Sequence, residues 1–114
     1  MRTLKLTIAY DGTRFAGWQI QNSRQKTQKP TIQETLERVL SQLLQERVRV
    51  VGSGRTDAGV HALAQVAHLR THSAIARRRL HEALNKLLPP DIVVTQVREA
   101  TPEFHARFDA IAKR

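Results

Sequence analysis

The sequence predicts an α+β protein of the ferredoxin-like, split β-α-β class, in which a four-stranded antiparallel sheet carries two helices on one face. Two stretches show the 3.6-residue apolar period of a helix, and the stretches around them show the alternation or the β-branched runs of strands. Their order along the chain is β-α-β-β-α-β, which is the order of this sandwich. A length of 114 residues suits one domain with a two-layer core.

Residues 3–10 form the first predicted strand. Its polar or small positions are Lys5, Thr7 and Ala9, and the positions between them are apolar, which indicates one buried face. These apolar residues are Leu4, Leu6, Ile8 and Tyr10. The Asp-Gly-Thr sequence of residues 11–13 has turn chemistry and ends the strand.

The next stretch combines basic and aromatic side chains. It contains Trp18, the only Trp of the chain, and Phe15, one of three Phe. Aromatic rings beside an arginine suit base stacking and phosphate pairing on unpaired RNA. We therefore predict RNA contacts for Arg14, Phe15, Trp18 and Gln19. The alternative is that the two rings plug the edge of the core.

Residues 20–30 are polar and basic, without apolar periodicity. We predict a basic loop in which Arg24, Lys26 and Lys29 contact phosphate groups of RNA. The alternative is a charged loop that is only solvated.

A helix is predicted to begin at Thr31. The sequence Thr31-Ile32-Gln33-Glu34 fits a capping box, in which Thr31 accepts a hydrogen bond from an N–H group of the first turn. One apolar stripe then faces the sheet, and it consists of Ile32, Leu36, Val39, Leu40, Leu43 and Leu44. A short β-branched strand follows at Val48, Val50 and Val51.

The loop from Gly52 to Ala62, with the sequence GSGRTDAGVHA, holds the most unusual chemistry. Its glycines permit positive φ and let the backbone approach a ligand closely. Arg55 and Asp57 are two residues apart, so in extended backbone their side chains share a face and Thr56 points away. We interpret the loop as a candidate active loop. The alternative is an ordinary hairpin turn with a solvated arginine.

The next strand is predicted at Val60 to Leu69, where it pairs with the strand that precedes the loop. A second helix is then predicted, with Ser73 as its N-cap. Three arginines crowd its first turn, where positive charge opposes the helix dipole. Either Arg77 and Arg78 contact RNA or the charges are tolerated. The stripe of this helix is Ala76, Leu80, Ala83, Leu84, Leu87 and Leu88.

Pro89-Pro90 ends the second helix, and residues 92–97 form the last strand of the unit. From Phe104 onward a new alternation begins, which predicts a further strand without a partner in this unit. The chain is therefore expected to be the first part of something longer, or to need a second copy that covers this strand.

Composition points to a polyanionic partner. The chain has 19 Lys and Arg against 10 Asp and Glu, a formal net charge of +9, which favours nucleic acid. No apolar run is long enough to span a bilayer and no signal-peptide core is present, so we expect a cytoplasmic protein. Because Cys is absent and the five His are scattered, we expect no metal site.

The sequence resembles the N-terminal half of the tRNA pseudouridine synthase A family. The resemblance covers nearly the whole chain, in the family's order. It rests on Tyr10-Asp11-Gly12, Phe15-Ala16-Gly17-Trp18-Gln19, Thr31-Ile32-Gln33-Glu34, Gly54-Arg55-Thr56-Asp57-Ala58-Gly59-Val60-His61-Ala62 and Phe104-His105-Ala106-Arg107-Phe108.

This resemblance implies isomerisation of uridine to pseudouridine in the anticodon stem-loop of tRNA, by a homodimer, without metal or organic cofactor. It implies that Asp57 is the catalytic aspartate and that Arg55 keeps it ionised or helps to extrude the uridine. Further RNA contacts are then expected at Thr56, Gly59, His61, Arg77, Arg78, His105 and Arg107.

In the family the chain continues into a Tyr-rich strand and a second, similar half, which supply a base-stacking tyrosine and a basic partner for the carboxylate. We therefore expect residues 1–101 to be the catalytic-loop domain and residues 102–114 to be a connector or strand that leads to an absent second half. Little or no turnover is expected from these 114 residues alone.

Two other classes fit part of the sequence. An RNA-binding module of the RNA-recognition-motif type has the same element order, but it predicts aromatic residues on the central strands, and the strand from Val60 to Leu69 has none. A basic structural protein of a ribonucleoprotein particle fits the size and charge but gives no reason for Arg55-Thr56-Asp57.

Overall fold

The computed structural model describes residues 1–18, 29–54 and 56–108. Its strands are β1 (Arg2–Tyr10), β2 (Val51–Gly52), β3 (Ala62–Thr71) and β4 (Ile92–Ala100), and its helices are α1 (Ile32–Leu44) and α2 (Arg77–Leu87). A short 3-10 helix, η1 (Gly12–Arg14), follows β1. The predicted element order is confirmed.

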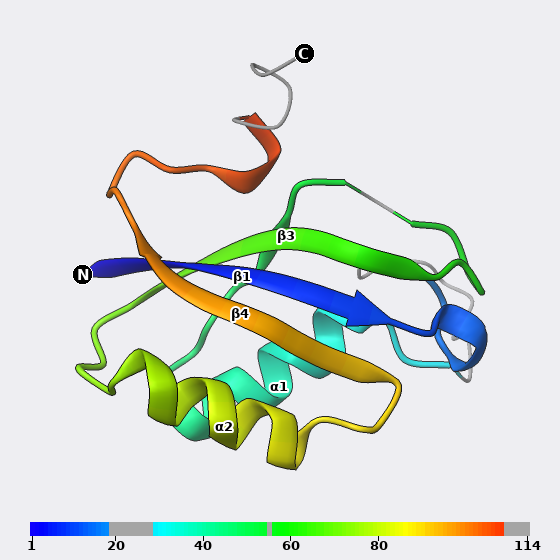
Figure 1. Cartoon of the computed structure of the whole chain (residues 1–114), viewed down its shortest axis with the longest axis horizontal. Helices are drawn as coiled ribbons and strands as arrows, with labels where there is room; N and C mark the ends of the chain where they lie inside the picture. Colours follow the sequence, from blue (N-terminus) through cyan, green and yellow to red (C-terminus); the bar gives the residue numbers. More distant parts are fainter. Residues whose placement is uncertain (19–28, 55, 109–114) are drawn as a thin grey trace.

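The four strands form one sheet in the order β2-β3-β1-β4, and every neighbouring pair is antiparallel. Both helices lie on the same side of this sheet (Figure 1). The alternation predicted for β1 places four side chains toward the helices, and all four are buried: Leu4, Leu6, Ile8 and Tyr10. They pack with fully buried leucines of the helices, namely Leu36, Leu40, Leu80 and Leu84. The ferredoxin-like fold class is therefore confirmed.

The start of α1 confirms the predicted cap. Thr31 Oγ1 accepts a hydrogen bond from the Glu34 N–H at 3.1 Å. The N–H groups of Ile32 and Gln33 donate to the main-chain carbonyls of Gly17 and Trp18, at 3.0 and 2.9 Å. These bonds satisfy orphan donors of the first turn, and they fix the segment after β1 against the helix.

The strand predicted at Val48 to Val51 is shorter and later than expected. Val48 and Val50 are buried in the core, but their N–H groups donate to side chains of α1, Ser41 Oγ at 3.0 Å and Glu37 Oε2 at 2.9 Å. Because these donors are already used by the helix, strand pairing begins only at Val51.

The predicted N-cap of the second helix is wrong. Ser73 Oγ accepts from the Ile75 N–H at 3.2 Å in a turn before the helix. Helix α2 begins at Arg77, with Ala76 as an N-cap that makes no side-chain hydrogen bond. Ile75 packs against the core, which sets the helix start later than the polar pattern indicates.

The segment after β4 also differs from the prediction. The strand runs on to Ala100, and residues 106–108 are helical where the alternation predicted a strand. Ala106 N–H donates to Nδ1 of His68 at 3.0 Å, and the His68 side chain on β3 is buried. This contact holds the segment against the sheet face opposite the helices (Figure 1). The last predicted stretch, 109–114, lies outside the described residues.

Candidate active site

The candidate active loop joins β2 to β3, and because Gly52 and Ala62 belong to these strands, the loop proper is residues 53–61. It lies at the end of the sheet where β1 ends and where β3 and β4 begin (Figure 1), because Tyr10 pairs with both Ala62 and Ile92. The entry side of the loop is tied to β3. The Ser53 N–H donates to the Val66 carbonyl at 2.7 Å, and Gln65 Nε2 donates to the Gly54 carbonyl at 2.6 Å.

Thr56 is held at two points, by the segment that follows β1 and by the last residue of β1. Its main-chain carbonyl accepts from the Trp18 N–H at 3.0 Å. Its hydroxyl lies 2.8 Å from the hydroxyl of Tyr10, and either oxygen can be the donor. The residue immediately before Asp57 is thus fixed through both its main chain and its side chain.

Asp57 begins a tight turn at the tip of the loop. Its carbonyl accepts from the Val60 N–H at 3.1 Å, and Gly59 has a φ of 81°. The Gly59 N–H donates to the Phe15 carbonyl at 3.3 Å. Asp57, Ala58 and Gly59 are exposed, so the turn presents the carboxylate to the outside while its two ends are bonded to the protein.

Two glycines let this supporting segment touch the loop. Gly17 has a φ of 91°, and a Cβ built there would lie 2.6 Å from the carbonyl oxygen of Thr56. A Cβ at Gly12 would lie 1.9 Å from the carbonyl oxygen of Val60. Neither distance is compatible with a side chain. Direct backbone packing of Gly12 and Gly17 therefore determines where the loop lies relative to the segment after β1.

The exit of the loop is fixed by His61. Its Nδ1 accepts from the Gly12 N–H at 2.9 Å, so the neutral ring carries its proton on Nε2. Asp11 Oδ1 lies 3.2 Å from the same nitrogen. That contact becomes an ion pair only if the ring is protonated, and the Gly12 N–H then loses its acceptor. Hydrogen bonds from the hydroxyl and N–H of Thr13 are the main cause that lowers the pKa of Asp11.

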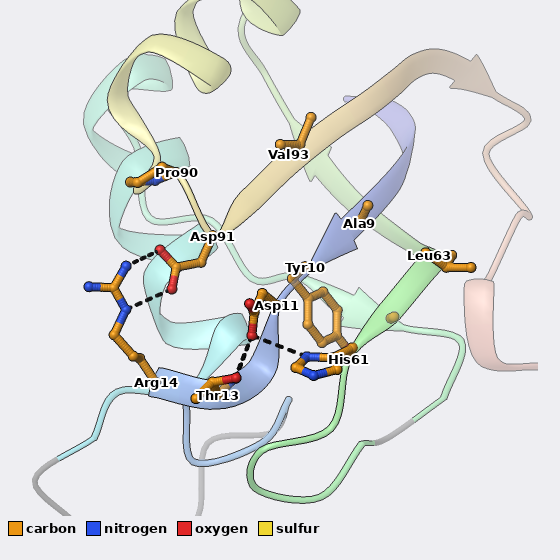
Figure 2. A pocket seen from close by; sticks show the side chains of 11 residues that line it. Ala9, Tyr10, Asp11, Thr13, Arg14, His61, Leu63, Pro90, Asp91 and Val93 are labelled. Atoms are coloured by element: carbon orange, nitrogen blue, oxygen red, sulfur yellow. Dashed lines mark hydrogen bonds and ion pairs between the residues drawn. The ribbon is translucent and has the colours of Figure 1, made fainter.

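A pocket of about 820 Å³ adjoins the exit of the loop. Its lining comes from the end of β1, the starts of β3 and β4 and the residues next to them. It includes Ala9, Tyr10, His61, Leu63 and Val93. Figure 2 shows Asp11 between Thr13 and His61 and, at the side, Arg14 paired with Asp91. The guanidinium makes two contacts to the Asp91 carboxylate, at 2.9 and 2.5 Å.

The structure places Phe15 and Trp18 in the core, with 4% and 2% of their surface exposed. The Trp18 ring packs on the Cα of Gly52, where a Cβ would lie 2.6 Å from the ring. The ring centroid is 6.2 Å from that of Tyr10. The two aromatic side chains are thus not available to stack on RNA bases, which corrects the prediction in favour of the core alternative.

The other predicted contacts are spread over the molecule. Thr56, Gly59 and His61 belong to the loop and Arg14 lies near it. Lys29 is exposed, with its Nζ 3.4 Å from the Thr13 carbonyl. Arg77 and Arg78 are exposed at the start of α2, at the opposite end of the sheet (Figure 1). His105 and Arg107 belong to the segment on the open sheet face. Arg55, Gln19, Arg24 and Lys26 lie outside the described residues.

Sequence reasoning missed the supporting role of Tyr10, Gly12 and Gly17. The sequence pattern that indicates this role is the pair Gly12 and Gly17, which stand among aromatic residues just after the first strand. Closely packed backbones need glycine.

Among the described residues, no three His, Asp or Glu side chains come together in a way that could hold a metal ion. None of the helices in the described ranges is long and apolar enough to cross a membrane.

Comparison with known proteins places the chain in a family. The family described as tRNA pseudouridine synthase matches residues 6–109. The chain is 52% identical to the tRNA pseudouridine synthase A of Chlorobium chlorochromatii over 110 residues, which cover 96% of this chain and 44% of that protein.

Two further relatives carry the same name. The protein of Ruminiclostridium cellulolyticum is 48% identical over 114 residues, 100% of this chain and 44% of its own length. The protein of Solidesulfovibrio magneticus is 51% identical over 113 residues, 99% of this chain and 40% of its own length. The chain thus spans less than half the length of these curated relatives.

Proposed function

Because the chain belongs to the tRNA pseudouridine synthase family, we propose that it provides the catalytic loop of an enzyme that isomerises uridine to pseudouridine in tRNA, with Asp57 as the catalytic carboxylate. The observation that carries the proposal is the exposed Asp57 in the turn at the tip of the loop, where the residues on either side, Thr56 and Gly59, are hydrogen-bonded to the segment after β1. A reacting carboxylate has to be both accessible and held in place.

The chemistry explains why an aspartate is needed. The C1′–N1 glycosidic bond breaks, the uracil turns within the site, a bond forms between C5 and C1′, and the hydrogen of C5 leaves to solvent while N1 gains one. An ionised carboxylate can assist by attacking C1′ of the ribose, by attacking C6 of the base or by removing a proton toward a glycal. All three routes require the Asp57 oxygen to approach a uridine that has left its stack.

The basic character of the chain supports a tRNA substrate. A formal net charge of +9 attracts the phosphate backbone. Near the loop, Arg14, Lys29 and His61 are exposed. In the proposal Arg55 pairs with Asp57 or a phosphate, a role that rests on the sequence alone. The anticodon stem-loop as target, a homodimer and a cytoplasmic location belong to the proposal through the family resemblance.

The active site is proposed to need residues outside these 114. Residues 1–101 would provide the catalytic loop and one wall of the cleft, and residues 102–114 would lead toward the other wall. The relatives are more than twice as long as the matched region. This arrangement accounts for a carboxylate that is exposed in the described part of the chain.

An RNA-recognition-motif type of module is less well supported. Such a module stacks bases on aromatic residues of its central strands. The only Phe, Tyr or Trp in β1 and β3 is Tyr10, and it is buried.

Release of tritium from tRNA that carries 5-tritiated uridine tests the proposal, because the new C5–C1′ bond displaces the label. A chain of family length that contains these 114 residues should release tritium to water, and the 114-residue chain alone should release little. tRNA labelled at C6 is the matched control, because that position keeps its hydrogen. No release by the family-length chain would contradict the proposed activity, and rapid release by the short chain would contradict the need for further residues.

A further inference from the structure

One hydrogen bond links the last residue of β1 to the residue before the proposed catalytic carboxylate. The hydroxyls of Tyr10 and Thr56 lie 2.8 Å apart. Thr56 was expected to contact RNA, but its hydroxyl is directed to the interior contact with Tyr10, and its carbonyl accepts from Trp18. The hydroxyl and the carbonyl of Thr56 are thus engaged within the protein.

Tyr10 is well placed to act as a fixed support. It is 5% exposed, it pairs with strands on both sides, and its ring packs 6.2 Å from that of Trp18. Burial raises the pKa of Tyr10 above its ordinary value, and the hydrogen bond with Thr56 opposes this effect only in part. The phenol therefore keeps its proton at neutral pH and remains a hydrogen-bond partner.

The main-chain hydrogen bonds alone do not fix the backbone rotation of Thr56, and the contact with Tyr10 restricts it. The Trp18 N–H and the Phe15 carbonyl hold the carbonyl of Thr56 and the N–H of Gly59. Between these two bonds lie Asp57 and Ala58, both exposed. Fixing the side chain of Thr56 restricts the rotation of its backbone. It therefore also restricts the direction in which the side chain of the next residue, Asp57, points.

We propose that Tyr10 is a positioning residue for the reaction, which holds Asp57 in its productive direction through the hydroxyl of Thr56. The inference rests on the proposed function of Asp57. It assigns to Tyr10 no contact with the substrate. A displacement of about 1 Å at a reacting group is enough to lower turnover by roughly 100-fold.

The test compares hydroxyl deletions in a chain of family length. Tyr10→Phe and Thr56→Val each remove one partner of the bond, and Thr56→Ser keeps the hydroxyl. In tritium-release assays with tRNA, the two deletions should each lower kcat by about 10- to 100-fold with KM unchanged within about 2-fold, because the lost interaction positions the reacting group and does not bind the RNA. Thr56→Ser should retain kcat within about 3-fold of the parent.

The double variant Tyr10→Phe with Thr56→Val should be no slower than the slower single variant, since both changes break the same bond. Thr35→Val is the matched control. The Thr35 hydroxyl is buried and donates to the Thr31 carbonyl at 2.9 Å within α1. That variant loses a comparable bond away from the loop, and its kcat should stay at the parent value.

Three results would overturn the inference: unchanged kcat in Tyr10→Phe, multiplied effects in the double variant, or an equal fall of kcat in Thr35→Val. These results are distinct from failure of the proposed function, in which the parent chain of family length shows no release at all. Thermal unfolding of each variant confirms that the assay temperature lies below the transition, so that a fall in kcat reports on folded protein.

Discussion

The main-chain N–H of Trp18 donates to the main-chain carbonyl of Thr56 at 3.0 Å. This bond joins the segment after β1 to the residue that precedes Asp57. The neighbouring carbonyl groups, of Gly17 and Trp18, accept from the first turn of α1. The segment thus connects the helix on one side with the candidate active loop on the other, and its geometry determines where the loop stands.

Replacement of Gly17 by alanine should loosen this connection. The residue has a φ of 91°, and the added Cβ would lie 2.6 Å from the Thr56 carbonyl oxygen. Both the backbone strain and the contact oppose the folded state, and we expect Gly17→Ala to lower the free energy of unfolding by about 1–3 kcal/mol. Urea unfolding of the 114-residue chain, followed by far-UV circular dichroism, measures the change.

Gly59→Ala provides the control for that substitution. Gly59 also has a positive φ, 81°, but among the described residues no atom beyond those of its chain neighbours lies within 4 Å of a Cβ built there. Its loss of stability should be limited to the backbone strain, about 1–2 kcal/mol, and should be smaller than that of Gly17→Ala. An equal loss at both positions would show that the contact with Thr56 contributes nothing.

Trp18 is expected to stabilise the folded protein as a core residue. Trp18 is 2% exposed and packs on Gly52 and Tyr10. Trp18→Ala should lower the free energy of unfolding by about 3–5 kcal/mol, the usual range for an aromatic core residue. Urea unfolding checks this value.

Leu63→Ala is the matched control, because this large apolar side chain is 90% exposed. It should change the free energy of unfolding by less than about 0.5 kcal/mol. If Trp18→Ala were as mild as Leu63→Ala, the ring would not be a core residue, and its prediction as a base-stacking residue would regain support.

The regular elements could be predicted from the sequence because their signals are local. The alternation from Leu4 to Tyr10 and the cap at Thr31 depend on residues close together in the chain, and the structure confirms both. The start of the strand near Val51 could not be predicted, because it is set by Glu37 and Ser41 of α1, which take the N–H groups of Val50 and Val48. Such competition is a tertiary effect without a local signature.

The candidate loop was found from its glycines and its Asp57, but the supporting segment was misinterpreted. Arg14 together with the nearby Trp18 gives the same sequence pattern whether the ring stacks on a base or fills the core. The burial of Trp18 and its close packing on Gly52 decide between the two. The alternation from Phe104 to Phe108 indicated a strand that does not form. Ala106 is buried because its N–H is bonded to His68 on the sheet face, and not because it pairs with a strand.

Stability should fall in acid partly through Glu46. Its carboxylate accepts hydrogen bonds from the Thr71 hydroxyl and from the His72 N–H. The Thr71 bond is the main cause that lowers the pKa of Glu46 below its ordinary value of 4.5. Because the folded-state pKa is the lower one, the stabilisation is complete above 4.5 and is lost as pH falls through the folded-state pKa.

Glu46→Gln should therefore weaken the acid dependence. Urea unfolding from about pH 7 to about pH 3 should show a smaller loss of stability in the variant than in the parent. The loss should not vanish, because the pKa of Asp11 is also lowered, chiefly by Thr13. Identical pH profiles for variant and parent would remove Glu46 from this role.

Asp57 is proposed to perform the chemistry and not to bind the RNA. The most direct measurement is tritium release from 5-tritiated uridine in tRNA by the Asp57→Asn variant of a family-length chain, together with the Kd for the same tRNA. Glu99→Gln, an exposed carboxylate-to-amide change on β4 whose ion-pair partner is Arg2, which is not a predicted RNA contact, serves as the control. We predict that Asp57→Asn lowers release by at least about 1,000-fold and leaves Kd within about 3-fold. Retained turnover in Asp57→Asn would contradict the account.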